Sequence, residues 1–185
     1  MKADRTIRQA EFRDASAIFR IVKKHPDTVL PRPISDIVQN IDRFLVCEQN
    51  SQVSGTVSWQ ILPEIGPPKL PSVEIKSLCV EPAMLRNGIG RALVEEAIGH
   101  IRPLHPAQIV VLTFAPAFFG KLGFREVSKQ SLMHKIYAGC INCTKFDSPF
   151  TCPEIAMALD LAGDEPCGAR VRRDKPPTPP QPERP

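Results

Sequence analysis

The sequence predicts an α/β (α+β) fold in which helices flank a central β-sheet. The chain has 185 residues, of which 42% are hydrophobic, and this is enough for one sizeable core. Segments typical of strands and helices follow one another in the order strand, helix, helix, three strands, helix, strand, helix, strands. Residues 89–101 carry apolar side chains on one helical face only, as a helix packed on a sheet does.

The expected elements are placed by hydrophobic periodicity and by the residues that stop them. Asp14 is a suitable N-cap for the first helix. Four prolines and a glycine make residues 63–72 a loop, and Pro82 closes the strand that follows it. Gly123 ends a short helix. The expected strands are residues 6–10, 44–48, 53–62, 73–81, 109–113, 124–127 and 154–161, and the expected helices are residues 14–24, 35–43, 89–101 and 117–121.

We expect one folded domain, residues 1–162, with a cysteine-containing loop at 139–153. Residues 163–185 hold seven of the 20 prolines and almost no large apolar side chain. Such a segment buries too little surface to offset the entropy of ordering. It is therefore predicted to be a disordered tail.

Charge and hydropathy argue against several classes of protein. Lys and Arg total 24 against 20 Asp and Glu, a net charge of +4, and the basic residues are spread along the chain, so nucleic-acid binding is not expected. No apolar run approaches the roughly 18 residues that span a bilayer, so we expect no membrane association and a cytoplasmic location. Six cysteines are too few for a disulfide scaffold, and reduced thiols are expected.

The most informative segment is the junction of strand, loop and helix at residues 77–93. Gly88 and Gly90 stand in the first turn of the helix, where several backbone N–H groups point at one spot and the helix dipole adds positive charge. Such a junction suits a pyrophosphate, although close packing of helix on sheet uses glycines in the same way. Two other phosphate motifs are excluded: no G-x-x-x-x-G-K-[ST] is present, and Leu93 occupies the third glycine position of G-x-G-x-x-G.

With its strand included, this junction resembles the pyrophosphate-binding motif of the GNAT acetyltransferases. The resemblance implies the GNAT fold, a mixed central β-sheet in which a splayed strand pair binds acetyl-CoA as co-substrate. Leu85 stands where the family usually has Arg or Gln, and Arg86 follows one place later. The residues that the resemblance assigns to CoA are Leu78, Cys79, Val80, Leu85, Arg86, Asn87, Gly88, Ile89, Gly90, Arg91 and Phe119.

Further segments resemble one branch of that family, the short stand-alone N-acetylglutamate synthases of bacterial arginine biosynthesis. The similarity extends over roughly residues 6–161 and is carried by Leu30-Pro31-Arg32, residues 40–44, residues 74–80, residues 112–124 and His134-Lys135-Ile136-Tyr137 with the cysteines after it. It implies direct transfer of acetyl from acetyl-CoA to the α-amine of L-glutamate. A homodimer is compatible with this resemblance.

Acetyl transfer to an amine requires removal of a proton, because most free α-amine is ammonium near neutral pH. By the resemblance, Glu74 is the candidate base; the alternative is a surface carboxylate paired with Lys76. The backbone N–H of Leu78 is the candidate donor to the oxyanion. Many GNAT enzymes have a tyrosine near the position of Phe119, whereas the only tyrosine here is Tyr137. The general acid is therefore left unassigned.

The two carboxylates of glutamate call for fixed cations in a partly dehydrated cleft. Arg32 lies between two prolines, and its planar fork can pair bidentately with a carboxylate; the alternative is a solvated loop arginine. Lys76 shares a strand face with Glu74 and would meet the second carboxylate; the alternative is a cross-strand ion pair. Ser77 and Thr113 are the other predicted acceptor contacts.

Cys140, Cys143 and Cys152 form a Cys-x2-Cys-x8-Cys pattern, which can hold zinc through thiolates. Only three ligands are evident, and neither His134 nor Cys167 has the spacing of a fourth. An unmetallated thiol cluster is the preferred interpretation, and no metal is assigned.

Three functions remain open from the sequence. The first is an N-acetylglutamate synthase. The second is an N-acetyltransferase for another amino acid, such as glutamine, or for another small amine. The third is a non-catalytic acyl-CoA-binding sensor, which Leu85 and the missing tyrosine would suit.

Overall fold

A computed structural model of the chain describes residues 5–63, 70–143 and 145–161. Within these residues the chain forms a seven-stranded mixed sheet with strand order β1-β2-β3-β4-β5-β7-β6. Neighbouring strands are antiparallel except β4 and β5, which are parallel. The strands are β1 (Arg5–Gln9), β2 (Phe44–Gln49), β3 (Gln52–Leu62), β4 (Ser72–Val80), β5 (Gln108–Thr113), β6 (Arg125–Glu126) and β7 (Ile155–Asp160). The predicted α/β class and mixed sheet are confirmed.

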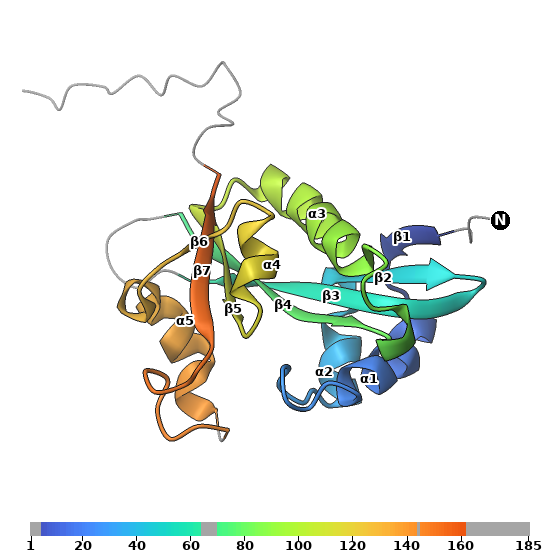
Figure 1. The fold of residues 1–185 in the computed structure, drawn as a ribbon, viewed down its shortest axis with the longest axis horizontal. Coiled ribbons are helices and arrows are strands. Elements are labelled where there is room, and N and C mark those ends of the chain that lie inside the picture. Colours follow the sequence, from blue (N-terminus) through green and yellow to red (C-terminus); the bar gives the residue numbers. More distant parts are fainter. Residues whose placement is uncertain (1–4, 64–69, 144, 162–185) are drawn as a thin grey trace, which may run out of the picture.

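Helices cover both faces of the sheet (Figure 1). On one face lies α3, and on the other lie α1 and α2. The α-helices are α1 (Ala15–Lys23), α2 (Ile34–Gln39), α3 (Ile89–Ile101), α4 (Pro116–Gly120) and α5 (Met133–Ala138). Short 3-10 turns are η1 (Phe12–Asp14), η2 (Ile41–Arg43), η3 (Pro82–Met84), η4 (Arg102–Leu104), η5 (Lys129–Leu132) and η6 (Cys140–Asn142). None of the described helices is long and apolar enough to cross a bilayer.

Helix α3 packs closely on the sheet through the predicted apolar stripe. Its residues Ile89, Leu93, Ala97 and Ile101 are each at most 1% exposed. Gly55 of β3 makes this approach possible, because a Cβ there would lie 3.0 Å from the Ile89 side chain and 3.1 Å from the Leu93 side chain. The helix start is thereby fixed against the sheet.

Strand β4 contains a β-bulge. Lys76 pairs with Ser58 but Cys79 pairs with Thr56, so β4 has one residue more than β3 in this interval. Ser77, inside the bulge, has a φ of 53°. Residues before the bulge with odd numbers, such as Ile75, pack on the α3 side, whereas Cys79 packs on the α1 side. The bulge therefore reverses which side chains of β4 face each helix layer.

Strands β4 and β5 diverge beyond their first paired residues. Val73 pairs with Ile109 and Glu74 with Val110, and the parallel ladder ends there, while β5 continues to pair with β7 as far as Thr113. This is the splayed strand pair that the family resemblance implied. It leaves the bulged half of β4 beside an opening in the sheet.

Several elements differ from the expectation. Asp14 does not cap α1 with its side chain; its carboxylate accepts the N–H of Glu11 at 2.8 Å and closes a capping box on η1. Phe124 lies in the core, 4% exposed, and the strand after it is only two residues long. No helix was predicted at residues 133–138, where α5 lies. The predicted loop at 63–72 is described only at its two ends, and the predicted tail at 163–185 lies outside the described residues.

Candidate active site

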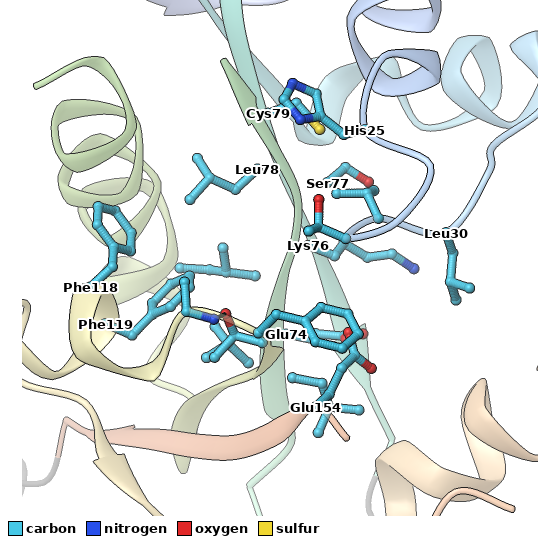
Figure 2. A pocket seen from close by; sticks show the side chains of 18 of the residues that line it. His25, Leu30, Glu74, Lys76, Ser77, Leu78, Cys79, Phe118, Phe119 and Glu154 are labelled. Carbon is cyan, nitrogen blue, oxygen red and sulfur yellow. Dashed lines mark hydrogen bonds between the residues drawn. The ribbon is translucent and has the colours of Figure 1, made fainter. Parts of the chain in front are cut away.

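A cavity of about 820 Å³ lies at the divergence of β4 and β5. It is lined by the segment between α1 and α2, the bulged half of β4, the start of α3, the end of β5 with α4, and residues from 129 to 154. Of the residues predicted for catalysis, CoA or acceptor, all but Asn87 line this cavity. Segments far apart in the sequence are thus brought to one site (Figure 2).

The predicted phosphate loop forms the end of the cavity beside α3. Gly88 is the N-cap of α3 with a φ of 75°, and Arg86 has a φ of 65°, so two left-handed residues shape the loop. The exposed Asn87 turns its carbonyl oxygen toward Arg5, whose Nη1 donates to it at 2.9 Å. This bond ties the loop to β1. The first turn of a 13-residue helix, with its free N–H groups and positive dipole end, therefore borders the cavity.

Phenyl rings of α4 form the wall next to this loop. Phe118 and Phe119 of α4 meet edge to face with centroids 5.0 Å apart, and Phe119 meets Phe124 at 5.4 Å. A Cβ at Gly90 would lie 3.7 Å from the ring of Phe118, so the helix start and α4 are close neighbours. Thr113 shapes this wall, since its Oγ1 accepts the backbone N–H of Ala115 at 2.9 Å where β5 turns into α4.

Glu74 is a buried carboxylate, 5% exposed, in the floor of the cavity. Its Oε1 lies 2.9 Å from the Nζ of Lys135, and its Oε2 has no hydrogen-bond partner among the described residues. The alternative of a surface carboxylate paired with Lys76 is wrong, because Glu74 is buried and pairs with Lys135. Lys76 instead donates from Nζ to Oε1 of Gln60 at 2.7 Å.

Lys135 was not predicted as a site residue. It lies on α5, a helix that was not predicted, is 8% exposed, and lines the cavity. Burial lowers the pKa of Lys135, but the charge and hydrogen bond of Glu74 outweigh this, so the pKa lies above its ordinary value. The signal available in the sequence was the pair Leu132 and Ile136, four residues apart and both buried, which marks the packed face of a short helix.

Arg32 is held in place on the α1 side of β4. Its Nε lies 2.7 Å from Oδ2 of Asp36, and its Nη1 lies 3.3 Å from the hydroxyl oxygens of both Ser58 and Ser77. The guanidinium stacks over Phe44 at 5.4 Å, and the side chain is 13% exposed. The alternative of a solvated loop arginine is therefore wrong. Burial lowers the pKa of Arg32, yet a guanidinium stays charged in a protein.

Lys76 lies on the same side of β4 as Ser77 and is half-buried (Figure 2). Burial lowers its pKa. In the described part of the chain no carboxylate lies within ion-pair distance of its ammonium, so the predicted alternative of a cross-strand ion pair is wrong. Lys76 is a cation whose partner, Gln60, is neutral.

Cys79, Cys140 and Cys152 contribute thiols rather than thiolates. Burial raises the pKa of Cys79 to about 12, and burial also raises the pKa of Cys140 and Cys152. Cys140, Cys143 and Cys152 line the cavity and are free. Among the described residues no three His, Cys, Asp or Glu side chains are grouped to hold a metal ion. Cys167 lies outside that part of the chain.

Glu154 and Lys145 complete the wall formed by the segment after α5. The Glu154 carboxylate lies in the cavity near Glu74, and burial raises its pKa (Figure 2). Lys145 donates from Nζ to the carbonyl oxygens of Pro26 at 3.0 Å and Asp27 at 2.6 Å. These bonds connect the segment after α5 to the segment after α1, on opposite walls of the cavity.

The sequence is similar to a family of acetyltransferases and to individual proteins. The model of the acetyltransferase (GNAT) domain matches residues 40–126. An uncharacterized N-acetyltransferase of Chlorobaculum tepidum is 34% identical over 161 residues, which are 86% of this chain and 98% of the relative. An amino-acid acetyltransferase of Mycobacterium tuberculosis is 26% identical over 136 residues, 71% of this chain and 74% of that protein.

Solved structures show the same fold. A Mycobacterium tuberculosis protein in complex with CoA superposes with a TM-score of 0.71 at 24% identity, over 84% of this chain and 99% of that one. N-acetylglutamate synthase from Neisseria gonorrhoeae, complexed with CoA and N-acetyl-glutamate, gives a TM-score of 0.69 at 18% identity, over 87% of this chain and 36% of that one. The chain belongs to the GNAT family and is an acetyl-CoA-dependent N-acetyltransferase.

Proposed function

We propose that this enzyme transfers the acetyl group of acetyl-CoA to the α-amine of L-glutamate. The proposal rests on one observation, the lack of a hydrogen-bond partner for Oε2 of Glu74 in the described part of the chain. This buried oxygen has no donor among the described residues and shares its cavity with the cations Arg32 and Lys76. A buried polar atom without a partner is costly, so the site is complementary to a ligand that brings an ammonium and carboxylates together.

The reaction follows from these positions. Glu74 Oε2 takes one proton from the ammonium, directly or through water, and the nitrogen lone pair attacks the thioester carbonyl. The C–N bond forms, and the carbonyl electrons move to an oxyanion that the backbone N–H of Leu78, at the bulge, stabilises. When the intermediate collapses the C–S bond breaks, and the thiolate of CoA receives the second proton of the nitrogen. The products are N-acetylglutamate and CoA, and Glu74 releases its proton to solvent before the next turnover.

The phosphate end of the site binds acetyl-CoA in this proposal. The pyrophosphate lies against the first turn of α3, where backbone N–H groups and the dipole favour an anion. Arg86 and Arg91 line the same end of the cavity and add positive charge. Phe118 and Phe119 form the apolar wall between this end and Glu74.

Two cations favour glutamate as acceptor. Nη2 of Arg32 makes no hydrogen bond to the described residues, and the ammonium of Lys76 has a neutral partner. Each can therefore pair with one carboxylate without breaking an ion pair in the free enzyme. The similarity to an amino-acid acetyltransferase supports an amino acid in this position. The product would be the first intermediate of arginine biosynthesis.

Glutamine is the second candidate acceptor, and Glu154 is the observation that favours it. This half-buried carboxyl lies in the cavity near Glu74 and accepts the weak S–H of Cys152 at a sulfur–oxygen distance of 3.6 Å. A side-chain amide could donate to it, whereas a second carboxylate would be repelled by its ionised form. Glutamine would keep one carboxylate for Arg32.

Release of free thiol from acetyl-CoA, measured with a panel of amino acids and small amines, tests the proposal. Glutamate is expected to give the highest kcat/KM. Turnover of glutamine with none of glutamate would replace the first candidate by the second. Binding of CoA without turnover of any amine would mean that the protein is a sensor.

A further inference from the structure

We propose that Lys135 is the positioning residue for the base: it holds Oε1 of Glu74 in a buried ion pair and so keeps Oε2 free and directed into the cavity. This inference rests on the proposed function, in which Glu74 removes the proton of the amine.

The ion pair is buried on both sides. Lys135 and Glu74 have side chains 10% and 6% exposed, and Nζ and Oε1 lie 2.9 Å apart. Oε1 of Glu74 is held by the ion pair, whereas Oε2 has no hydrogen-bond partner among the described residues. Oε1 therefore anchors the side chain, and Oε2 is left to accept a proton. A carboxylate held at one oxygen loses rotational freedom, which places the reactive oxygen before the substrate arrives.

The end of α5 is built around the ammonium. A Cβ at Gly139 would lie 3.2 Å from the Nζ of Lys135, closer than nearly all real contacts of this kind. The N–H of Gly139 donates to the carbonyl oxygen of Lys135 at 3.1 Å and closes the last turn of the helix. A larger residue at 139 would require the ammonium to shift by a few tenths of an ångström.

Other titratable groups lie around Glu74 on four segments of the chain, and none of them replaces Lys135. Arg32 is engaged by Asp36, and Lys76 by Gln60. Cys140 of η6 and Glu154 before β7 also interact with the pair. Among the described residues, only Lys135 lies within ion-pair distance of Glu74.

Removing the ammonium of Lys135 should change the pH dependence of the reaction in one direction. A buried carboxylate without a nearby positive charge favours its protonated form, and Glu154 adds repulsion in the same sense. A protonated Glu74 cannot accept a proton from the amine. Removal of Lys135 should therefore move the acid limb of the rate profile to higher pH, and looser placement of Oε2 should lower the plateau.

The test compares Lys135→Met, which keeps an unbranched side chain but lacks the ammonium, with Lys135→Arg, which keeps the charge. In the pH profile of kcat/KM, we expect Lys135→Met to shift the acid limb upward by about one pH unit or more and to lower the plateau about tenfold or more. Lys135→Arg should keep the limb near its wild-type position. The matched control is Lys24→Met, which removes an exposed lysine paired with Glu81 at 2.7 Å and should change neither quantity. An unmoved limb in folded Lys135→Met would overturn the proposal.

A second measurement does not depend on the acceptor. The ¹³C carboxyl signal of Glu74, assigned by its loss in Glu74→Gln, is titrated in the free wild-type and Lys135→Met proteins. Its midpoint should move to higher pH in the variant, and an unchanged midpoint would contradict the proposal even if no amino acid is acetylated. If Lys135→Met does not fold, Lys135→Met/Glu74→Gln should recover folding. A double variant as unstable as the single one would also overturn the inference.

Discussion

The hydroxyl of Ser77 lies 3.3 Å from Nη1 of Arg32, and the bulge in β4 creates this contact. In a regular strand Ser77 would point toward α3, the side on which Ile75 packs. The bulge turns it to the opposite side, where Lys76 already lies. The acceptor end of the cavity is therefore assembled by one additional residue in one strand.

Arg32→Ala should weaken binding of the amino acid without affecting the cofactor. We expect the KM for glutamate to rise at least about tenfold, equivalent to about 1.4 kcal/mol, while the KM for acetyl-CoA stays within about twofold. Steady-state kinetics with each substrate varied in turn measure both. Arg125→Ala is the control, because Arg125 forms an exposed ion pair with Asp160. Equal rises in both constants would instead indicate damage to the fold.

Glu74→Gln should affect the chemical step. The amide keeps the size of the side chain but cannot take a proton, so we expect kcat to fall by about a hundredfold or more with little change in acetyl-CoA binding. The acid limb of the pH profile should also disappear. Stopped assays over a range of pH values, with CoA binding measured by calorimetry, separate the two effects. A variant with wild-type kcat and pH profile would remove Glu74 from the role of base.

Gly90→Ala tests the approach of phosphate to the start of α3. The added Cβ would lie 3.7 Å from the Phe118 ring and 3.8 Å from the Val80 side chain, both ordinary contacts, so the free protein should tolerate it. It would occupy space beside the N–H groups, and we expect the KM for acetyl-CoA to rise about tenfold or more.

The control lies in the same helix. A Cβ at Gly99 meets nothing within 4 Å, so Gly99→Ala should leave the kinetics unchanged and stabilise the protein by about 0.5–1 kcal/mol through helix propensity. If Gly90→Ala bound acetyl-CoA as the wild type does, the phosphate would lie elsewhere.

Asp14 is expected to govern stability in acid rather than activity. It is 5% exposed and accepts bonds from Arg8 at 2.7 and 3.0 Å. Burial raises the pKa of Asp14, but the bonds from Arg8 and from the N–H of Glu11 outweigh this, so its pKa lies below the ordinary value. A depressed pKa stabilises the fold above the ordinary value near 4, and this contribution is lost as the pH falls through the folded pKa.

Asp14→Asn should lower the free energy of unfolding at pH 7 by about 2 kcal/mol and flatten its fall between about pH 5 and pH 2. Urea denaturation at several pH values measures both. Asp160→Asn, which breaks an exposed pair, should cost less than about 0.5 kcal/mol. Equal costs for the two variants would contradict the importance of the buried network.

Local patterns were sufficient for most of the fold. The packed face of α3 was predicted correctly because Ile89, Ala97 and Ile101 belong to one buried stripe at helical spacing. The loop before α3 was recognisable because its glycines lie close together in the sequence. Predicted residues of the site lie together because β4, the loop and α3 are consecutive, so one motif contains most of them.

The missing parts depend on long-range contacts. Helix α5 is six residues long and has no capping bond from a side chain, so local signals for it are weak. The ion pair of Lys135 with Glu74 joins two segments that lie far apart in the sequence. No local pattern around either residue predicts this pairing. The bulge in β4 is equally hidden, because its flanking apolar residues are typical of a strand buried on both faces.

The most direct measurement is kcat/KM for L-glutamate and for L-glutamine with the same enzyme preparation, with the acetylated product identified by mass spectrometry. If Arg32 and Lys76 each bind one carboxylate, glutamate should exceed glutamine by about tenfold or more and N-acetylglutamate should accumulate in equal amount to free CoA. Equal or higher efficiency with glutamine, or release of thiol without N-acetylglutamate, would contradict the proposed function.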